Sequence, residues 1–104
     1  MAEIKSEIIE KVRKYLELVE SRGIKVDSAY IFGSYSTGKY DEWSDIDLAI
    51  ISESFSGKLL IDIEKILGLA RKVDSRISAL PMNFESLNSP FLQSEVLGKG
   101  YRVV

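Results

Sequence analysis

The 104-residue chain contains no cysteine and no histidine. The lack of cysteine excludes disulfides, thiol nucleophiles and thiolate zinc ligands, and the lack of histidine excludes Ser-His and Cys-His catalytic pairs. Any catalysis by this chain must therefore use carboxylates, hydroxyls, amines or backbone groups.

The chain also lacks a long apolar run and a large excess of either charge. Its 14 Lys and Arg residues against 16 Asp and Glu residues give a net charge of −2, which argues against wrapping nucleic acid by bulk phosphate neutralisation. The run 48–51 is far shorter than the roughly 20 apolar residues that cross a bilayer, and the acidic start of the chain has no signal-peptide pattern. We therefore expect a cytoplasmic protein that does not associate with membranes.

Apolar residues at helical spacing predict helices over residues 2–22 and 58–71, and shorter helical pieces are expected over 84–87 and 91–97. We expect one domain over residues 1–104, because a chain of this length can bury a core without a disulfide or a structural metal. The apolar stripe of the first helix should belong to this core; it consists of Ile4, Ile8, Val12, Leu16 and Val19.

Short runs rich in β-branched and aromatic residues predict strands at 28–32 and 45–51. Residues 73–80 alternate between two faces and predict a third strand, which Pro81 should end, and residues 100–104 could add a fourth. The order of the elements predicts an α/β (α+β) fold in which helices pack on a small mixed β-sheet.

Two carboxylates at the start of the second strand are the first part of a candidate site. Asp45 and Asp47 are two residues apart, so in a strand they project to the same side, with their backbones about 6.5 to 7 Å apart. Two ionised carboxylates in such proximity repel each other and favour a bound cation. Mg²⁺ suits them, because it is commonly held by one or two carboxylates together with substrate phosphates.

The second part of the candidate site is a glycine-serine pair where the first strand ends. Gly33 lets the backbone turn sharply and approach a ligand, and Ser34 offers a hydroxyl and an amide to a phosphate oxygen. The segment 33–44 is expected to be a loop with at most one helical turn. Asp74, on the predicted third strand, is the candidate for a third carboxylate that would complete a two-metal site.

These two parts together resemble a known signature. Residues 31–38 read IFGSYSTG and residues 44–50 read SDIDLAI, which is similar to the polymerase-beta-like nucleotidyltransferase superfamily and its minimal single-domain members. The resemblance implies the fold of that family, with a nucleoside triphosphate (ATP or another) and two Mg²⁺ ions held by the Gly-Ser loop and the Asp-x-Asp strand. It also implies a third acidic residue on a later strand, which activates the acceptor hydroxyl.

The chain departs from the family pattern at two places. The family often has a basic residue inside the Gly-Ser loop, where this chain has Tyr, Ser and Thr, so Lys39 is the nearest cation for the phosphates. The family also often has an acid at the position that aligns with Ser78. The identity of the third carboxylate therefore stays open, with Asp74 as the candidate.

Two functions remain open from the sequence. The first is a magnesium-dependent nucleotidyltransferase that transfers a nucleoside monophosphate to a hydroxyl, with Asp45, Asp47 and Asp74 as metal ligands and catalytic residues and with Gly33, Ser34 and Lys39 at the nucleotide. The second is a catalytically degenerate module that binds a nucleotide or regulates a helical partner. The resemblance implies a partner of the HEPN type, in a toxin-antitoxin pair, or a second copy of the chain, and it leaves a nucleic-acid acceptor open.

Overall fold

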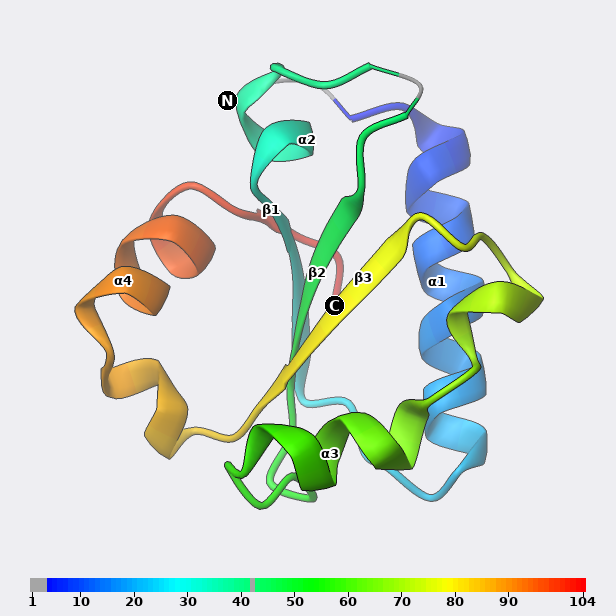
Figure 1. Ribbon diagram of the computed structural model, residues 1–104. Helices are drawn as coiled ribbons and strands as arrows, with labels where there is room; N and C mark the ends of the chain where they lie inside the picture. The colour runs from blue at the N-terminus through cyan, green and yellow to red at the C-terminus, as the bar shows by residue number, and fades with distance from the viewer. Residues whose placement is uncertain (1–3, 42) are drawn as a thin grey trace.

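In the residues that the computed structural model describes, 4–41 and 43–104, four strands form one mixed sheet in the order β3-β2-β1-β4 (Figure 1). The central strand β1 (Ser28–Phe32) pairs antiparallel with β2 (Ile46–Ile51) on one side and with β4 (Tyr101–Arg102) on the other. The strand β3 (Ile77–Met82) pairs parallel with β2 and forms an edge of the sheet. The predicted α+β fold with a small mixed sheet is confirmed.

The long helix α1 (Ser6–Ser21) covers one face of this sheet, and the predicted apolar stripe of that helix is buried. The helix begins at Ser6 rather than at residue 2, because Lys5 has an extended backbone with ψ of 139°. The Lys5 carbonyl accepts hydrogen bonds from the backbone N–H groups of Ile8 and Ile9 and so closes the first turn. Residues 2 and 3 of the predicted helix lie outside the described residues.

The side chains of β2 alternate between two apolar clusters on opposite faces of the sheet. Ile46, Leu48 and Ile50 belong to the larger cluster, which includes the buried side of α1. Ala49 and Ile51 belong to a smaller cluster on the other face. Because Asp47 alternates with Ile46 and Leu48, its side chain lies on the face of the smaller cluster, away from α1.

The C-terminal third of the chain covers the face of the smaller cluster with short helical turns (Figure 1). These are η2 (Glu85–Asn88), α4 (Pro90–Leu92) and the π-helical η3 (Gln93–Gly98), and they agree in position with the two predicted helical pieces. Val96 on η3 is fully buried and packs in the smaller cluster. Within 4–41 and 43–104, none of the helices combines the length and the apolar character that crossing a membrane requires.

The helix predicted over 58–71 is shorter in the structure. The helix α3 (Leu59–Ile66) ends early, because Gly68 adopts a positive φ of 84°, and a separate turn, η1 (Ala70–Lys72), follows it. In Figure 1, α3 lies at one end of the sheet and the short helix α2 (Ser34–Thr37) lies at the opposite end.

The third strand was predicted over 73–80 but occupies Ile77–Met82, so Pro81 does not end it. Ile46 N–H donates to the Arg76 carbonyl and Ser52 N–H donates to the Met82 carbonyl. In a parallel ladder with this register, the backbone N–H and C=O groups of the even-numbered residues of β3 point toward β2, and those of the odd-numbered residues point toward the open edge of the sheet. The backbone nitrogen of Pro81 therefore points toward the open edge of the sheet, and its lack of an N–H costs no hydrogen bond of the ladder.

Candidate active site

Gly33 lies against the carboxylate of Asp47. The antiparallel register pairs Phe32 with Asp47, which places Gly33 at the end of β1 beside the start of β2. Gly33 has a φ of 71°, and a Cβ atom on this residue would collide with Asp47 Oδ2 and lie 3.3 Å from Asp47 Cγ. Only glycine fits here, so the predicted approach of the Gly-Ser bend to the Asp-x-Asp segment is present in the structure.

The two predicted carboxylates lie close enough to influence each other. Asp45 is exposed and directly precedes β2, one residue outside the strand, and Asp47 is half-buried on β2. Burial raises the pKa of the Asp47 carboxyl, and the negative charge of Asp45 raises that pKa further. The folded chain thus holds a pair of repelling carboxylates, which a bound cation would stabilise.

Ser34 is the first residue of α2, the single helical turn expected in this loop. The Gly33 carbonyl accepts hydrogen bonds from the Ser36 N–H at 3.2 Å and the Ser36 hydroxyl at 2.9 Å, which fix the turn against the end of β1. Gly38 ends α2 in the left-handed conformation. Lys39 follows it and is exposed, so the structure places this lysine at the end of α2 that is farther from Ser34.

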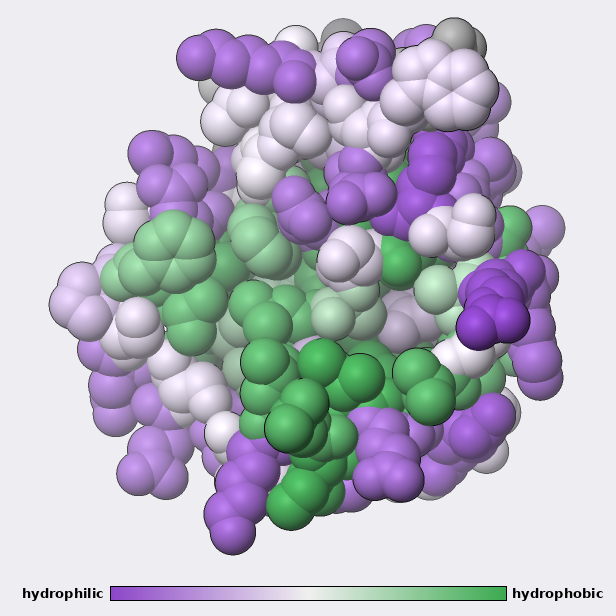
Figure 2. All heavy atoms as spheres, viewed as in Figure 1, coloured by the Kyte–Doolittle hydropathy of each residue, from purple (hydrophilic) through white to green (hydrophobic). Residues whose placement is uncertain are grey.

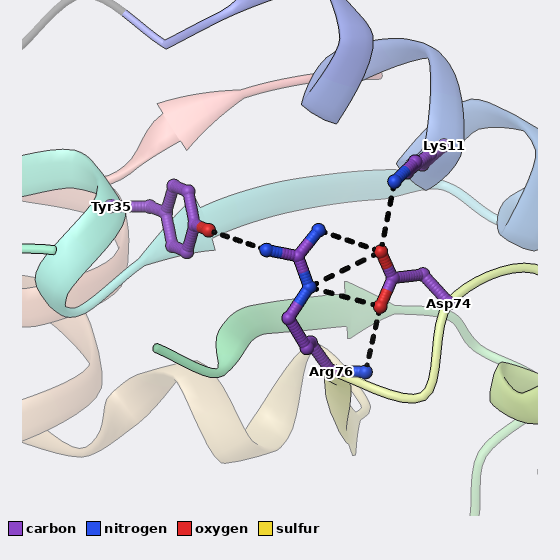
Figure 3. Close-up of polar contacts among 4 residues, drawn as sticks. All are labelled: Lys11, Tyr35, Asp74 and Arg76. Carbon is purple, nitrogen blue, oxygen red and sulfur yellow. Dashed lines mark hydrogen bonds and ion pairs between the residues drawn. The ribbon is translucent and has the colours of Figure 1, made fainter. Parts of the chain in front are cut away.

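Asp74 belongs to a different cluster, shown in Figure 3. Its Oδ2 atom lies 2.7 Å from Arg76 Nη2 and 3.1 Å from Lys11 Nζ, and its Oδ1 atom accepts the Arg76 backbone N–H at 2.9 Å. The hydrogen bonds from the Arg76 side chain hold the pKa of the Asp74 carboxyl well below its usual range. Asp74 lies in the turn before β3, not on the strand as predicted, because these bonds close the turn.

The structure does not bring Asp74 together with Asp45 and Asp47. Lys11 is on α1, which covers the face of the sheet opposite to the side chain of Asp47. Across residues 4–41 and 43–104, no three acidic side chains gather as a group that could hold a metal ion. In the parallel register the residue beside Asp47 on β3 is Ser78, an exposed residue on the strand that the family uses for its third acid.

Lys11 and Tyr35 were not identified as members of the Asp74 cluster by the sequence analysis. Arg76 Nη1 donates to the hydroxyl of Tyr35 at 3.3 Å (Figure 3). Tyr35 is a buried residue of α2, and its ring stacks on that of Tyr40 with centroids 4.2 Å apart. The cluster thus ties α1, the turn before β3 and α2 to one another. Neither Lys11 nor Tyr35 belongs to a local motif with Asp74, so the sequence gives no signal for these contacts.

The carboxylate pair fits one divalent cation. Both carboxylates offer oxygen atoms as ligands. Asp47 is half-buried beside the charge of Asp45, so the pair is less stable without a cation than with one. Mg²⁺ is commonly bound by one or two protein carboxylates and takes its remaining ligands from water and substrate phosphates. A second ion would need those other ligands, because the described residues supply no third acid at this place.

Comparison with known proteins agrees with this geometry. The model of the nucleotidyltransferase domain family matches residues 9–100. Two relatives from Methanocaldococcus jannaschii, MJ1379 and MJ0141, are each named "Putative protein adenylyltransferase". The first is 37% identical over 88% of this chain and 89% of its own length, and the second is 31% identical over 88% and 81%.

Solved structures share the fold. A toxin-antitoxin crystallised with AMP-PNP has a TM-score of 0.63 and 26% identity, covering 92% of this chain and 72% of that chain. A nucleotidyltransferase structure from Sulfolobus solfataricus has a TM-score of 0.59 and 21% identity, covering 85% and 83% of the two chains. The family match, the two relatives and the shared fold together show that this chain belongs to the nucleotidyltransferase domain family and has the form of a minimal nucleotidyltransferase.

Proposed function

We propose that this chain transfers an adenylyl group from ATP to a hydroxyl group of a protein partner. The observation that carries the proposal is the contact between Gly33 and the Asp47 carboxylate, because it joins a bend suited to phosphates with a pair of metal-binding acids. The names of the two Methanocaldococcus jannaschii relatives support a protein acceptor. The AMP-PNP in the related toxin-antitoxin structure supports an adenine nucleotide.

In the proposed reaction the acceptor oxygen forms a bond to the α-phosphorus of ATP. The bond from that phosphorus to the oxygen that bridges it to the β-phosphate breaks, pyrophosphate leaves, and the hydroxyl proton passes to solvent. Asp45 and Asp47 would hold the cation, while Gly33 and Ser34, at the bend beside Asp47, would lie against the phosphates and keep the leaving group in line with the acceptor. Bound Mg²⁺ would supply positive charge that offsets the charge developing on the phosphate oxygens.

The partner is proposed to be a helical protein of the HEPN type in a toxin-antitoxin pair. The two parts of the motif resemble those of minimal nucleotidyltransferases that occur with such partners, and two of the related solved structures are toxin-antitoxin structures. The long helix α1 covers one face of the small sheet, and η2, α4 and η3 cover the other (Figure 1). The helical partner is proposed to supply the acceptor group.

A second function, nucleotide binding without transfer, is favoured by one observation. Ser78 occupies the register position beside Asp47, where the family often has an acid that activates the acceptor. A chain without that acid could bind ATP and regulate its partner while transferring nothing. The experiment must therefore separate binding from transfer.

The experiment supplies purified chain with Mg²⁺, a cell extract of its source organism, and ATP labelled at the α- or the γ-phosphate. Adenylyl transfer predicts that adding the chain attaches the α-label to a protein and adds no γ-label beyond what the extract shows without the chain. The variants Asp45→Asn and Asp47→Asn should abolish the labelling. The matched variant Asp27→Asn, which removes a carboxylate near the other end of β1, should retain it.

Attachment of the γ-label that depends on the added chain, or α-labelling that persists in both active-site variants, would contradict the proposal. Magnesium-dependent binding of ATP without any transfer of the α-label would select the regulatory function instead. Calorimetry on the same preparations measures the binding separately from the transfer.

A further inference from the structure

The helix α3 and the residue that follows it expose a group of large apolar side chains. Within the described residues this segment has more of them than any other element, and they are Leu59, Leu60, Ile61 and Leu67. Leu60 is 82% exposed and Leu67 is 68% exposed. Figure 2 shows apolar atoms gathered over α3 and across β3 that continue toward α4, with hydrophilic atoms above and below them. Exposed apolar groups of this kind mark interaction sites.

Part of this surface is hollow. Leu60, Ile63 and Leu67 follow the spacing i, i+3 and i+7, so they share one side of α3. Beside them a cavity of about 160 Å³ opens between α3, η1 and β3, and Ala79 is among the residues that line it. We term Leu60, Ile63, Leu67 and Ala79 the α3 apolar surface. A hollow of this size accepts one protruding apolar side chain.

The neighbouring sheet edge disfavours a partner that adds a strand. Ile77, Ala79 and Pro81 are the outward-facing residues of β3. The Ile77 N–H already donates to the Asp74 carbonyl at 3.1 Å, and Pro81 has no N–H. An added strand would therefore find few donors on β3, whereas a helix docks through its side chains and needs none.

The surroundings of the surface are basic although the whole chain is acidic. The segment 58–72 has four basic residues and two acidic residues, in a chain with a net charge of −2. One of the two acids, Asp62, is fully buried, accepts hydrogen bonds from the Ser56 and Gly57 backbone N–H groups, and pairs with Lys65 at 3.8 Å. This pair offsets one basic residue of the segment. Glu64 is the one exposed acid of this segment, whereas Lys58, Arg71 and Lys72 are exposed.

We infer that the α3 apolar surface binds an amphipathic helix of a partner protein, with acidic residues on both sides of its apolar stripe. Charge complementarity favours this occupant over a second copy of the chain, because a two-fold contact would bring the same basic residues together. The hollow favours it over a membrane, since a lipid surface covers a protruding apolar face rather than filling a pocket. The surface is at the end of the sheet opposite to α2, so this inference does not depend on nucleotide chemistry (Figure 1).

The test uses the full chain and two synthetic helical peptides of about 18 residues, long enough to form isolated helices. Both peptides carry the same leucine stripe, flanked by Glu in one and by Lys in the other. Titration calorimetry should show that the Glu peptide binds roughly ten-fold or more tightly than the Lys peptide, with an affinity that falls as salt is raised.

Substitutions on and around the α3 apolar surface test whether the Glu peptide binds there. Leu60→Ser combined with Leu67→Ser should lower the affinity for the Glu peptide by about ten-fold or more. Circular dichroism should show an intact fold, because both side chains are exposed. The triple variant Lys58→Glu, Arg71→Glu and Lys72→Glu should reverse the preference between the peptides. The control variant Arg13→Glu with Lys14→Glu changes two exposed charges on α1 and should bind like the wild type.

The inference is overturned by equal binding of the two peptides, by no binding of either, or by binding that both serines leave unchanged. It is also overturned if light scattering detects a dimer that the two serines dissociate, since the occupant is then a second copy. Binding to phosphatidylserine vesicles without binding to the Glu peptide would overturn it in favour of a membrane. The Asp47→Asn variant should bind the peptide normally, which separates this result from the nucleotide site.

Discussion

The carboxylate of Asp47 occupies the space that a side chain on residue 33 would need. This contact couples two segments that are 14 positions apart, and it makes the shape of the bend at the end of β1 depend on an acid at the start of β2. Substitutions at Gly33 and at Asp47 therefore both test this contact.

Replacing Gly33 with Ala should both destabilise the chain and abolish ATP binding. Its positive φ and the collision with Asp47 together should cost about 2 to 3 kcal/mol in the free energy of unfolding, and the Asp47 side chain must move. The control is Gly23→Ala, which also has a positive φ but has no atom within 4 Å of the added Cβ. It should cost about 1 kcal/mol and leave ATP binding, measured by calorimetry, unchanged.

Replacing Asp47 with Asn should stabilise the metal-free chain at neutral pH. The folded state raises the Asp47 pKa, so the folded chain binds more protons than the unfolded chain just above pH 4, and stability falls as pH rises through that window. The Asn variant removes this loss, so its melting temperature at pH 7 should lie above that of the wild type.

Mg²⁺ should change the melting temperature of the wild type but not that of the Asp47→Asn variant. It should raise the melting temperature of the wild type, because it binds the folded carboxylate pair, and leave the Asp47→Asn variant nearly unchanged. A metal-free variant that melts below the wild type at pH 7 would show that the two carboxylates are not under electrostatic strain.

Replacing Asp74 with Asn should destabilise the chain without preventing Mg²⁺-dependent ATP binding. The ion pairs with Arg76 and Lys11 would weaken, at a cost of about 2 kcal/mol. The lowered Asp74 pKa contributes stability that is present above about pH 4 and is lost as pH falls toward the folded pKa, so the variant should lose less stability in acid. Loss of ATP binding by a folded Asp74→Asn chain would instead restore Asp74 as a metal ligand.

Replacing Ser78 with Asp should build the third carboxylate beside Asp47. The new charge lies next to Asp47 in register, so the metal-free variant should be less stable at pH 7 by about 0.5 to 1 kcal/mol, and its affinity for Mn²⁺ should rise. Ser75→Asp, on an exposed position in the turn before β3, is the control and should not change Mn²⁺ affinity. Equal Mn²⁺ affinity in all three chains would show that residue 78 does not face the carboxylate pair.

Local patterns predicted the parts of the fold and site that depend on local geometry. The first strand occupies residues 28–32 as predicted, because turn-forming residues bound it on both sides. The proximity of Asp45 and Asp47 follows from their spacing, and their approach to Gly33 follows from the antiparallel pairing of β1 with β2, which residues 33–45 connect.

Longer-range features were not predictable in the same way. The Asp74 contact with Lys11 joins residues 63 positions apart, and nothing near Asp74 in the sequence shows which face of the sheet it approaches. The predicted bounds of the third strand are wrong at both ends: the hydrogen bonds of Asp74 keep residues 73–76 in a turn, and the position of β3 at the sheet edge tolerates Pro81. The early end of α3 depends on one glycine, Gly68, inside an otherwise continuous apolar pattern.

The central claim is that Asp45 and Asp47 bind a divalent cation together with ATP beside Gly33. Calorimetric titration of ATP into the wild type, with and without Mg²⁺, tests it most directly, and the fluorescence of the exposed Trp43, two residues before Asp45, provides a second signal. The account predicts ATP binding that requires Mg²⁺ and is lost in Asp45→Asn and Asp47→Asn but kept in Asp27→Asn. ATP binding of equal strength without Mg²⁺, or in both active-site variants, would contradict it.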